Sequence, residues 1–129
     1  MNIRRLDHLV VTARDMDATV KFYTEVLGMR LVTFGEGRRA LAFGDQKINL
    51  HDAAKPYVPH ARQPMPGAVD VCFIAAEPVE TVMAELKAKG IKIEEGIVAK
   101  TGARAPLRSL YIRDPDGNLI EISNEVGGT

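Results

Sequence analysis

Alternating apolar and polar positions predict a strand at residues 6–12, in which His8 lies on the face that tolerates polar side chains. Asp15 can cap a helix after this strand. The apolar side chains of residues 16–27 recur at helical spacing, and Gly28 follows where a helix-ending glycine is common. Three further strands are predicted at residues 29–34, 40–43 and 47–51. The first half of the chain therefore has the order strand, helix and three strands.

The same pattern begins again after a proline-rich connector. Residues 52–67 contain four prolines, which exclude a helix or a central strand there. A strand is predicted at residues 69–74, and a helix runs from Pro78, a favoured first helical residue, to Gly90. Later strands are predicted at residues 91–93, 107–113 and 119–123.

The two halves form an internal repeat. A constant offset along the sequence, equal to the spacing from Gly28 to Gly90, superimposes one half on the other. The same offset pairs Asp15 with Glu77, Thr19 with Thr81, Val20 with Val82 and Leu31 with Ile93. We therefore predict an α+β fold of two βαβββ modules, at residues 1–55 and 66–126 of a single domain that spans residues 1–129. Each helix covers one face of its sheet, so the uncovered faces of a curled mixed sheet would surround a central cavity for a metal and a substrate.

Polar side chains recur at equivalent places on these uncovered faces. At the same offset His8 falls on Asp70, and a longer offset for the last strands places Asn49 on Glu121. His51 shares the face of Asn49, because side chains alternate along a strand. Imidazole and carboxylate groups together suit Zn²⁺, Fe²⁺, Mn²⁺, Ni²⁺ or Co²⁺, and an open coordination position would admit water or substrate. We expect a site built from His8, Asp70, Glu121 and either Asn49 or His51.

The segment before Glu121 explains how this carboxylate enters a strand. Asp-Pro-Asp-Gly at residues 114–117 is a tight-turn sequence. In the strand that follows, Ile120 and Ile122 share one face and Glu121 lies on the other. Such a carboxylate faces either solvent or a polar cavity, and the place of Glu121 in the repeat favours the cavity.

Composition narrows the class of function. The chain carries 17 basic and 17 acidic side chains, so the formal net charge is zero and nothing favours nucleic acid or an anionic membrane as a partner. No apolar run is long enough to span a bilayer, and the N-terminus lacks the apolar core of a secretion signal. The single cysteine, Cys72, cannot form an internal disulfide. We therefore expect a cytoplasmic protein.

Several stretches of the sequence resemble one known superfamily. They are residues 6–11 (LDHLVV), 22–23 (FY), 26–29 (VLGM) and 114–121 (DPDGNLIE). Together they resemble the vicinal oxygen chelate superfamily, which includes glyoxalase I, methylmalonyl-CoA epimerase, extradiol dioxygenases and the fosfomycin and bleomycin resistance proteins. Residues 43–51 and 100–103 look most like the group of glyoxalase-domain-containing protein 5 and bacterial virulence-associated glyoxalases.

The resemblance implies roles for the polar residues of the repeat. His8 matches the first-strand ligand of the superfamily, and Glu121 matches the last-strand glutamate, a metal ligand that also moves the substrate proton. Asp70 stands where most relatives have a second histidine. Relatives use Glu or Gln where this chain has Asn49, and we expect His51 to serve instead. The expected metal ligands are therefore His8, His51, Asp70 and Glu121, holding a divalent Zn, Ni, Mn, Fe or Co ion.

The resemblance also implies a function and an assembly. It implies a metal-dependent lyase or isomerase of the glyoxalase I type, acting as a homodimer on a small substrate with vicinal oxygens. Two alternatives are an extradiol ring-cleaving dioxygenase and a non-catalytic drug-binding protein of the bleomycin resistance type. The drug binder would need a stacking groove, which a chain without tryptophan and with 5% aromatic residues supplies poorly. Candidates to hold an anionic substrate are Arg14, Arg38, Arg39 and Arg104.

Overall fold

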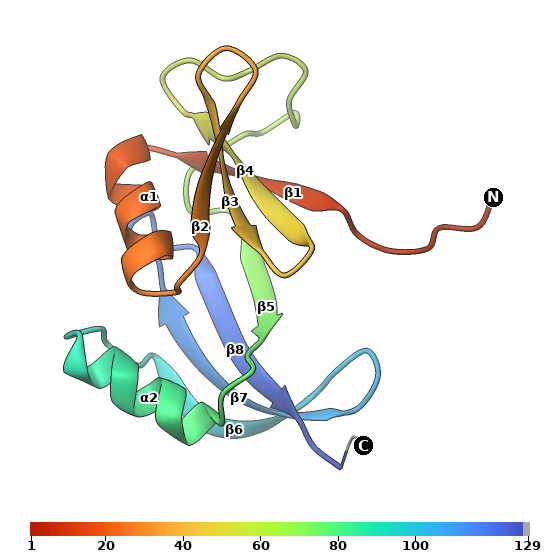
Figure 1. The fold of residues 1–129 in the computed structure, drawn as a ribbon, viewed down its shortest axis with the longest axis vertical. Helices are drawn as coiled ribbons and strands as arrows, with labels where there is room; N and C mark the ends of the chain where they lie inside the picture. Colours follow the sequence, from red (N-terminus) through yellow and green to blue (C-terminus); the bar gives the residue numbers. More distant parts are fainter. Residues whose placement is uncertain (128–129) are drawn as a thin grey trace. The chain divides into compact units, whose positions relative to one another are not determined.

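The computed structural model describes residues 1–127, which divide into two compact units after Ala68. Residues 128 and 129, the last two of the predicted domain, lie outside the described residues. Each unit contains one helix and one four-stranded sheet (Figure 1). The predicted α+β fold of two βαβββ modules is confirmed.

The first unit has its strands in the order β1-β4-β3-β2. Its elements are β1 (His8–Ala13), α1 (Met16–Glu25), β2 (Arg30–Phe34), β3 (Arg38–Phe43) and β4 (Gln46–Asp52). Strands β1 and β4 are parallel, and the other pairs are antiparallel. Helix α1 contacts β2, β3 and β4 on one face of this sheet. Between them lies the core, with fully buried side chains such as Val11, Tyr23, Leu41 and Ile48.

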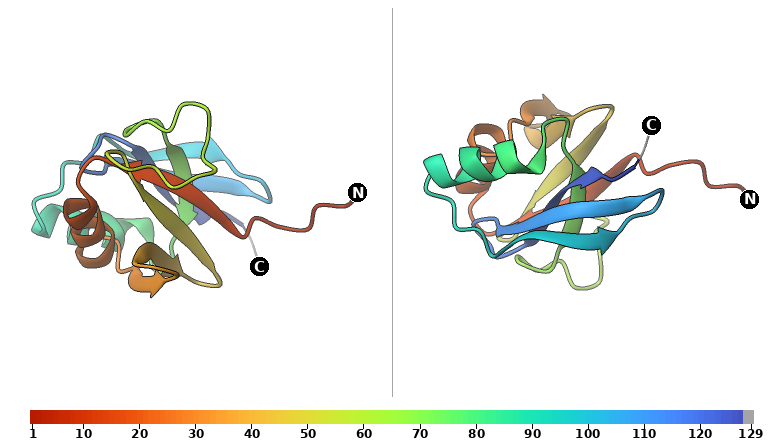
Figure 2. Two further views of the ribbon diagram at one scale, coloured as in Figure 1. Left: turned by 90° about the horizontal axis from the view of Figure 1, so that it is seen from above. Right: turned by 90° about the horizontal axis from the view of Figure 1, so that it is seen from below.

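The second unit repeats this arrangement, with its strands in the order β5-β8-β7-β6. Its elements are β5 (Asp70–Ile74), α2 (Val79–Ala88), β6 (Glu95–Thr101), β7 (Pro106–Arg113) and β8 (Leu119–Glu125). Helix α2 contacts β7 and β8, and the right-hand view of Figure 2 shows this green helix along one face of the blue strands. The core between them includes Val79, Leu110, Ile112 and Ile120, all fully buried.

Strand register confirms the repeat residue by residue. His8 and Asp70 are the first residues of β1 and β5. Two positions along, Val10 pairs with Asn49 in the first unit and Cys72 pairs with Glu121 in the second. The shorter predicted offset therefore relates the first strands of the two units, and the longer offset relates their last strands. Each helix has ten residues, and no helix in the described part of the chain is long and apolar enough to cross a membrane.

The predicted strand at residues 91–93 is wrong. Backbone N–H of Ile91 still bonds to the carbonyl of Leu86 in α2, so this segment serves to end the helix. The strand begins four residues later, at Glu95, after the N–H of Glu94 has bonded to the carbonyl of Tyr111. A local contact at the end of the helix therefore overrides the apolar alternation that predicted the strand.

The tight turn before β8 is held by its own side chains. One carboxylate oxygen of Asp114 accepts the backbone N–H groups of Asp116 and Asn118 at 2.9 Å each. The other accepts the side-chain amide of Asn118 at 2.7 Å, and the amide oxygen of Asn118 accepts the N–H of Val69 at 2.8 Å. The turn thus connects β7 to β8 and also fixes the entry into β5. It thereby sets the start of β8, the strand that contains Glu121.

Candidate functional site

Two of the predicted site residues come together in the second unit. Asp70 pairs with Leu119 in the β5–β8 ladder, and Glu121 lies two residues further along β8 on the same face. Both line a pocket of about 440 Å³. The other lining residues are Glu94, Glu95, Tyr111, Arg113 and Leu119. Glu121 also lines a neighbouring pocket of about 550 Å³ with Cys72, so this carboxylate is accessible from both hollows.

Glu121 is held by a chain of hydroxyl groups. The hydroxyl of Ser109 donates to Oε2 of Glu121 at 2.6 Å, and the Oγ atoms of Ser109 and Ser123 are 2.7 Å apart. Because Ser109 has a single proton to donate and the carboxylate can only accept, Ser123 is the donor in that second contact. The Sγ of Cys72 lies 3.3 Å from Oγ of Ser123 and then donates in turn. Both serines are fully buried, so they fix Oε2 rigidly.

The thiol of Cys72, at the far end of this series of hydrogen bonds, keeps its proton. Although Cys72 is exposed, desolvation by the surrounding atoms raises the pKa of its thiol, and the charge of Glu121 raises it further. A protonated thiol can donate to Ser123, in agreement with the direction of the chain. The structure therefore assigns Cys72 a supporting contact and no nucleophilic thiolate.

Tyr111 provides a neutral hydroxyl next to Glu121. The two residues are directly paired across β7 and β8. Burial, followed by the charge of Glu121 and a hydrogen bond with it, raises the pKa of Tyr111 to about 12. The phenol therefore stays protonated at neutral pH and is a donor. Sequence reasoning missed Ser109 and Tyr111, although their alternation in the strand at residues 107–113 places both on the face of Glu121.

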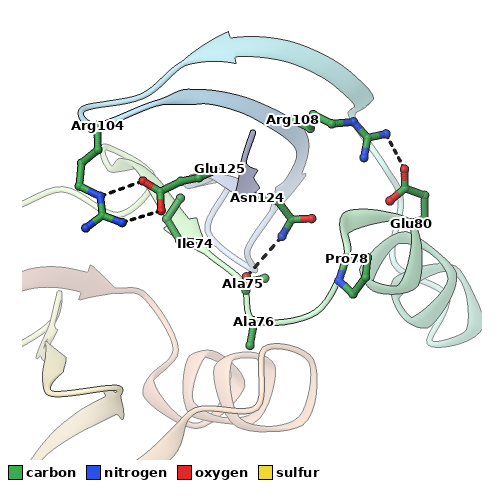
Figure 3. Close-up of a pocket in the computed structure, with 9 residues that line it drawn as sticks. All are labelled: Ile74, Ala75, Ala76, Pro78, Glu80, Arg104, Arg108, Asn124 and Glu125. Atoms are coloured by element: carbon green, nitrogen blue, oxygen red, sulfur yellow. Dashed lines mark hydrogen bonds and ion pairs between the residues drawn. The ribbon is translucent and has the colours of Figure 1, made fainter. Parts of the chain in front are cut away.

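In a third pocket of the second unit, the charged side chains of the lining are paired with one another (Figure 3). It has a volume of about 460 Å³. Arg104 makes two hydrogen bonds to Glu125, at 3.0 and 2.9 Å, and Arg108 pairs with Glu80. Asn124 accepts the first backbone N–H of α2 at 2.7 Å. The charged groups are thus already engaged, and Arg104 does not present a free guanidinium to a substrate.

The two predicted histidine ligands lie apart in the first unit. His8 is exposed, and its Nδ1 lies 2.9 Å from the carboxylate of Asp7. In the β1–β4 ladder His8 pairs with Lys47, whereas His51 pairs with Thr12, four residues further on. Four residues of a strand span roughly 13 Å, and side chains stand roughly perpendicular to the sheet. The sheet therefore does not bring His8 and His51 together, since an ion binds each nitrogen at about 2.1 Å.

Asn49 lies closer to His8 and carries an unsatisfied atom. It pairs with Val10, only two residues from the level of His8, and on the same face. Its Oδ1 and the Nδ1 of His51 are buried and have no hydrogen-bond partner among residues 1–127. Burial lowers the pKa of His51, and the positive charge of Arg38 lowers it further, so this imidazole is neutral at pH 7.

The structure thus assembles the predicted residues in pairs. Asp70 and Glu121 share a pocket in the second unit, and His8 and Asn49 are near neighbours on one face in the first. Within the described residues, no three side chains of His, Cys, Asp or Glu are grouped so as to hold a metal ion.

Comparison with known proteins gives close relatives along nearly the whole chain. The virulence protein STM3117 of Salmonella typhimurium is 52% identical over 126 residues, which cover 98% of this chain and 88% of the relative. Its crystal structure matches with a TM-score of 0.96, covering 98% of this chain and 100% of the other. The glyoxalase domain-containing protein RDO1 of Mycosarcoma maydis is 50% identical over 96% of this chain and 70% of the relative.

A more distant relative of known structure is named as an enzyme. The crystal structure of lactoylglutathione lyase from Agrobacterium tumefaciens is 25% identical and matches with a TM-score of 0.74, covering 95% of each chain. The sequence profile of the Glyoxalase/Bleomycin resistance protein/Dioxygenase superfamily matches residues 5–122. The predicted resemblance to this superfamily and to its virulence-associated group is thereby confirmed. The chain belongs to the Glyoxalase/Bleomycin resistance protein/Dioxygenase superfamily.

Proposed function

We propose that the protein is a metal-dependent lyase or isomerase of the glyoxalase I type, acting on a small substrate with two vicinal oxygens. Family membership and the similarity to a lactoylglutathione lyase support this reaction class. The observation that carries the proposal is the fixed carboxylate of Glu121, held at one oxygen by two fully buried serines and exposed to two pockets. A carboxylate oriented in this way suits proton transfer.

The donor types of the proposed ligands suit a divalent metal ion. His8, Asp70 and Glu121 supply one imidazole and two carboxylates, which suit Zn, Ni, Mn, Fe or Co. The unsatisfied Oδ1 of Asn49 supplies a fourth donor on the face of His8. We favour Asn49 over His51 for this position because of its shorter separation from His8 along the strands. The ligands would come from one chain or from two copies in a homodimer.

The chain's own residues would position the substrate and move its proton. A bound divalent ion supplies Lewis acidity, which polarises the substrate oxygens. Both serine contacts fall on Oε2 of Glu121, so a proton taken from the substrate would be held at Oε1. Ser109 donates to the carboxylate, and Ser123 donates to Ser109, so together they hold the carboxylate in place before the transfer. The neutral hydroxyl of Tyr111, which is hydrogen-bonded with Glu121, adds to the groups that orient this carboxylate.

A ring-cleaving dioxygenase is the second candidate. A biphenyl-2,3-diol 1,2-dioxygenase of Sphingomonas paucimobilis is 30% identical over 93% of this chain, although the match covers 38% of that protein. Oxygenases of non-haem iron commonly use two histidines and one carboxylate. Here the set contains His8 with the two carboxylates of Asp70 and Glu121. The donor set therefore favours the lyase or isomerase.

The assembly and location belong to the same proposal. A near-neutral chain offers little charge repulsion against self-association, and we propose a homodimer. Size-exclusion chromatography with light scattering would measure its mass. The single cysteine fits a reducing compartment, and we propose the cytoplasm.

The proposed function is tested by metal analysis of protein purified without added metal or chelator. We expect about one divalent ion per chain in the native protein, and loss of the ion in His8→Ala and Glu121→Gln. His60→Ala is the matched control, because His60 is exposed and its ring bonds only to the carbonyl of Ala61 among the described residues. His51→Ala asks directly whether that imidazole is a ligand.

Each result has a defined meaning. Retention of stoichiometric metal in both His8→Ala and Glu121→Gln would overturn the proposed site. Loss of metal in His51→Ala, with retention in Asn49→Ala, would restore His51 as the fourth ligand. Lactoylglutathione formation or ring cleavage of a biphenyl diol by the metal-loaded protein would then separate the two reaction classes.

A further inference from the structure

A hollow at the end of β4 in the first unit contains polar groups that the proposed reaction does not use. Its volume is about 620 Å³, within the range of about 300–1,000 Å³ that is usual for small-molecule sites. Its walls are the β2–β3 hairpin, the end of β4 and the first residues of the connector. The hairpin and the connector lie beside each other at the upper end of this unit in Figure 1.

Arg38 in this hollow has charge and donors but no carboxylate partner. Its guanidinium carbon lies 4.6 Å from the ring centroid of Phe34 and 3.9 Å from that of Tyr57. Cation–π contacts hold the side chain in place, yet they supply no oxygen acceptor for its five N–H donors. No ion pair joins Arg38 to an acidic side chain anywhere in residues 1–127. Its neighbour Arg39, by contrast, is paired with Asp17 at 2.9 Å.

His51 adds a second unsatisfied group to the same hollow. The residue is 5% exposed, and its Nδ1 lacks a hydrogen-bond partner among the described residues. The ring lies 6.0 Å from that of Tyr57, measured between centroids. Buried polar atoms without partners are rare in folded proteins because they are destabilising. A ligand that forms a hydrogen bond with Nδ1 would remove this cost.

The remaining lining indicates which ligand fits. The lining contains three cationic side chains, Arg38, Arg39 and Lys55, and two carboxylates, Glu36 and Asp52, so the hollow suits one negative charge better than two. The carboxylate of Asp52 accepts the backbone N–H of Ala54 at 2.9 Å and is thereby held in place. Apolar wall comes from Met16, Leu50, Pro56 and Val58. A single carboxylate on an apolar body matches this combination.

We propose that this hollow binds a small organic molecule through its carboxylate group. The N–H groups of Arg38 bind the carboxylate, Nδ1 of His51 forms a hydrogen bond with the ligand, and the apolar body packs against Pro56 and Val58. A guanidinium is suited to this task because its paired N–H donors match the two oxygens of a carboxylate. The pocket lies within the first unit and requires no metal, so it is independent of the proposed reaction.

The test uses benzoate as the probe and metal-free protein in the presence of a chelator. Titrations are followed by amide chemical shifts in two-dimensional NMR. We expect saturable shifts at residues 35–38 and 51–58 of the native protein. Arg38→Gln should weaken benzoate binding about tenfold or more, and Arg38→Lys should also weaken it, because an ammonium lacks the planar pair of donors. Arg30→Gln is the matched control, because Arg30 is exposed in β2 and does not line the hollow, and we expect its affinity to change about twofold or less.

Folding of each variant is checked first by its melting temperature, and Arg38→Lys keeps the test valid if the glutamine variant is unstable. Equal weakening in the Arg38 and Arg30 variants would overturn the assigned anchor, as would shifts confined to residues outside the hollow. Benzyl alcohol that binds as tightly as benzoate would show that the carboxylate is not recognised. Inorganic phosphate that binds more tightly, with the same dependence on Arg38, would overturn the organic carboxylate in favour of a bare oxyanion.

Discussion

The first and second units place different side chains at equivalent positions of the same fold. On the last strand, Asn49 and His51 of the first unit correspond to Glu121 and Ser123 of the second, because they pair with equivalent residues of β1 and β5. On the neighbouring strand, Ser109 pairs with Ser123 in β8. Arg38 holds the corresponding place in β3, one residue beyond the pair of Arg39 with Leu50.

The outcome for the polar atoms differs sharply between the units. In the second unit Ser109, Ser123 and Glu121 satisfy one another through hydrogen bonds. In the first unit Asn49 and His51 each keep a buried atom without a partner among the described residues. The two units therefore share a backbone fold but differ in the hydrogen bonding of their equivalent polar side chains. The second unit holds a carboxylate ready, whereas the first leaves donors and acceptors for a ligand to satisfy.

The largest expected effects concern the shared core. Ile48 and Ile120 are equivalent residues, and both are fully buried beneath their helices. We expect Ile48→Ala and Ile120→Ala each to lower the free energy of unfolding by about 2–5 kcal/mol, because each leaves a cavity. Urea denaturation would measure both. A cost below about 1 kcal/mol for one variant alone would show that the two cores are not packed equivalently.

The turns before the last strands of the two units should contribute differently to the free energy of unfolding. Asp114→Ala removes the acceptor of three hydrogen bonds in a buried turn, and we expect a loss of about 1–3 kcal/mol in the free energy of unfolding. Asp45 lies in the corresponding turn of the first unit, with an 87% exposed side chain. Asp45→Ala should change stability by about 0.5 kcal/mol or less. Similar losses for both variants in urea denaturation would contradict this difference.

The helix caps offer the smallest and finest comparison. Helix α1 is capped locally by Asp15, which accepts the N–H of Ala18 at 3.0 Å, whereas α2 is capped by Asn124 from β8 at 2.7 Å. Loss of a cap costs about 0.5–2 kcal/mol. We expect Asn124→Ala to fall near the upper end of that range, because its amide also donates to the carbonyl of Glu77 at 2.9 Å. A larger loss for Asp15→Ala, measured by thermal denaturation and circular dichroism, would contradict this ranking.

Much of the architecture followed from local sequence signals. The helices, the repeat and the turn at residues 114–117 could be predicted because periodicity and turn chemistry act over a few residues. The equivalence of His8 with Asp70 and of Asn49 with Glu121 followed from the same spacing, and the strand register confirms it. The prediction of a strand at residues 91–93 was wrong because three alternating residues are too short a signal to outweigh a helix terminus.

The sequence by itself thus determined which polar residues occupy equivalent faces, but only the tertiary structure decided which of them meet. The register of β1 and β4 separates His8 from His51, and the pairing of β7 with β8 places Ser109 where it donates to Glu121. The fold of the connector brings Tyr57 over Arg38. These contacts join residues that are distant along the chain, so their geometry depends on strand pairing and packing, which no local pattern encodes.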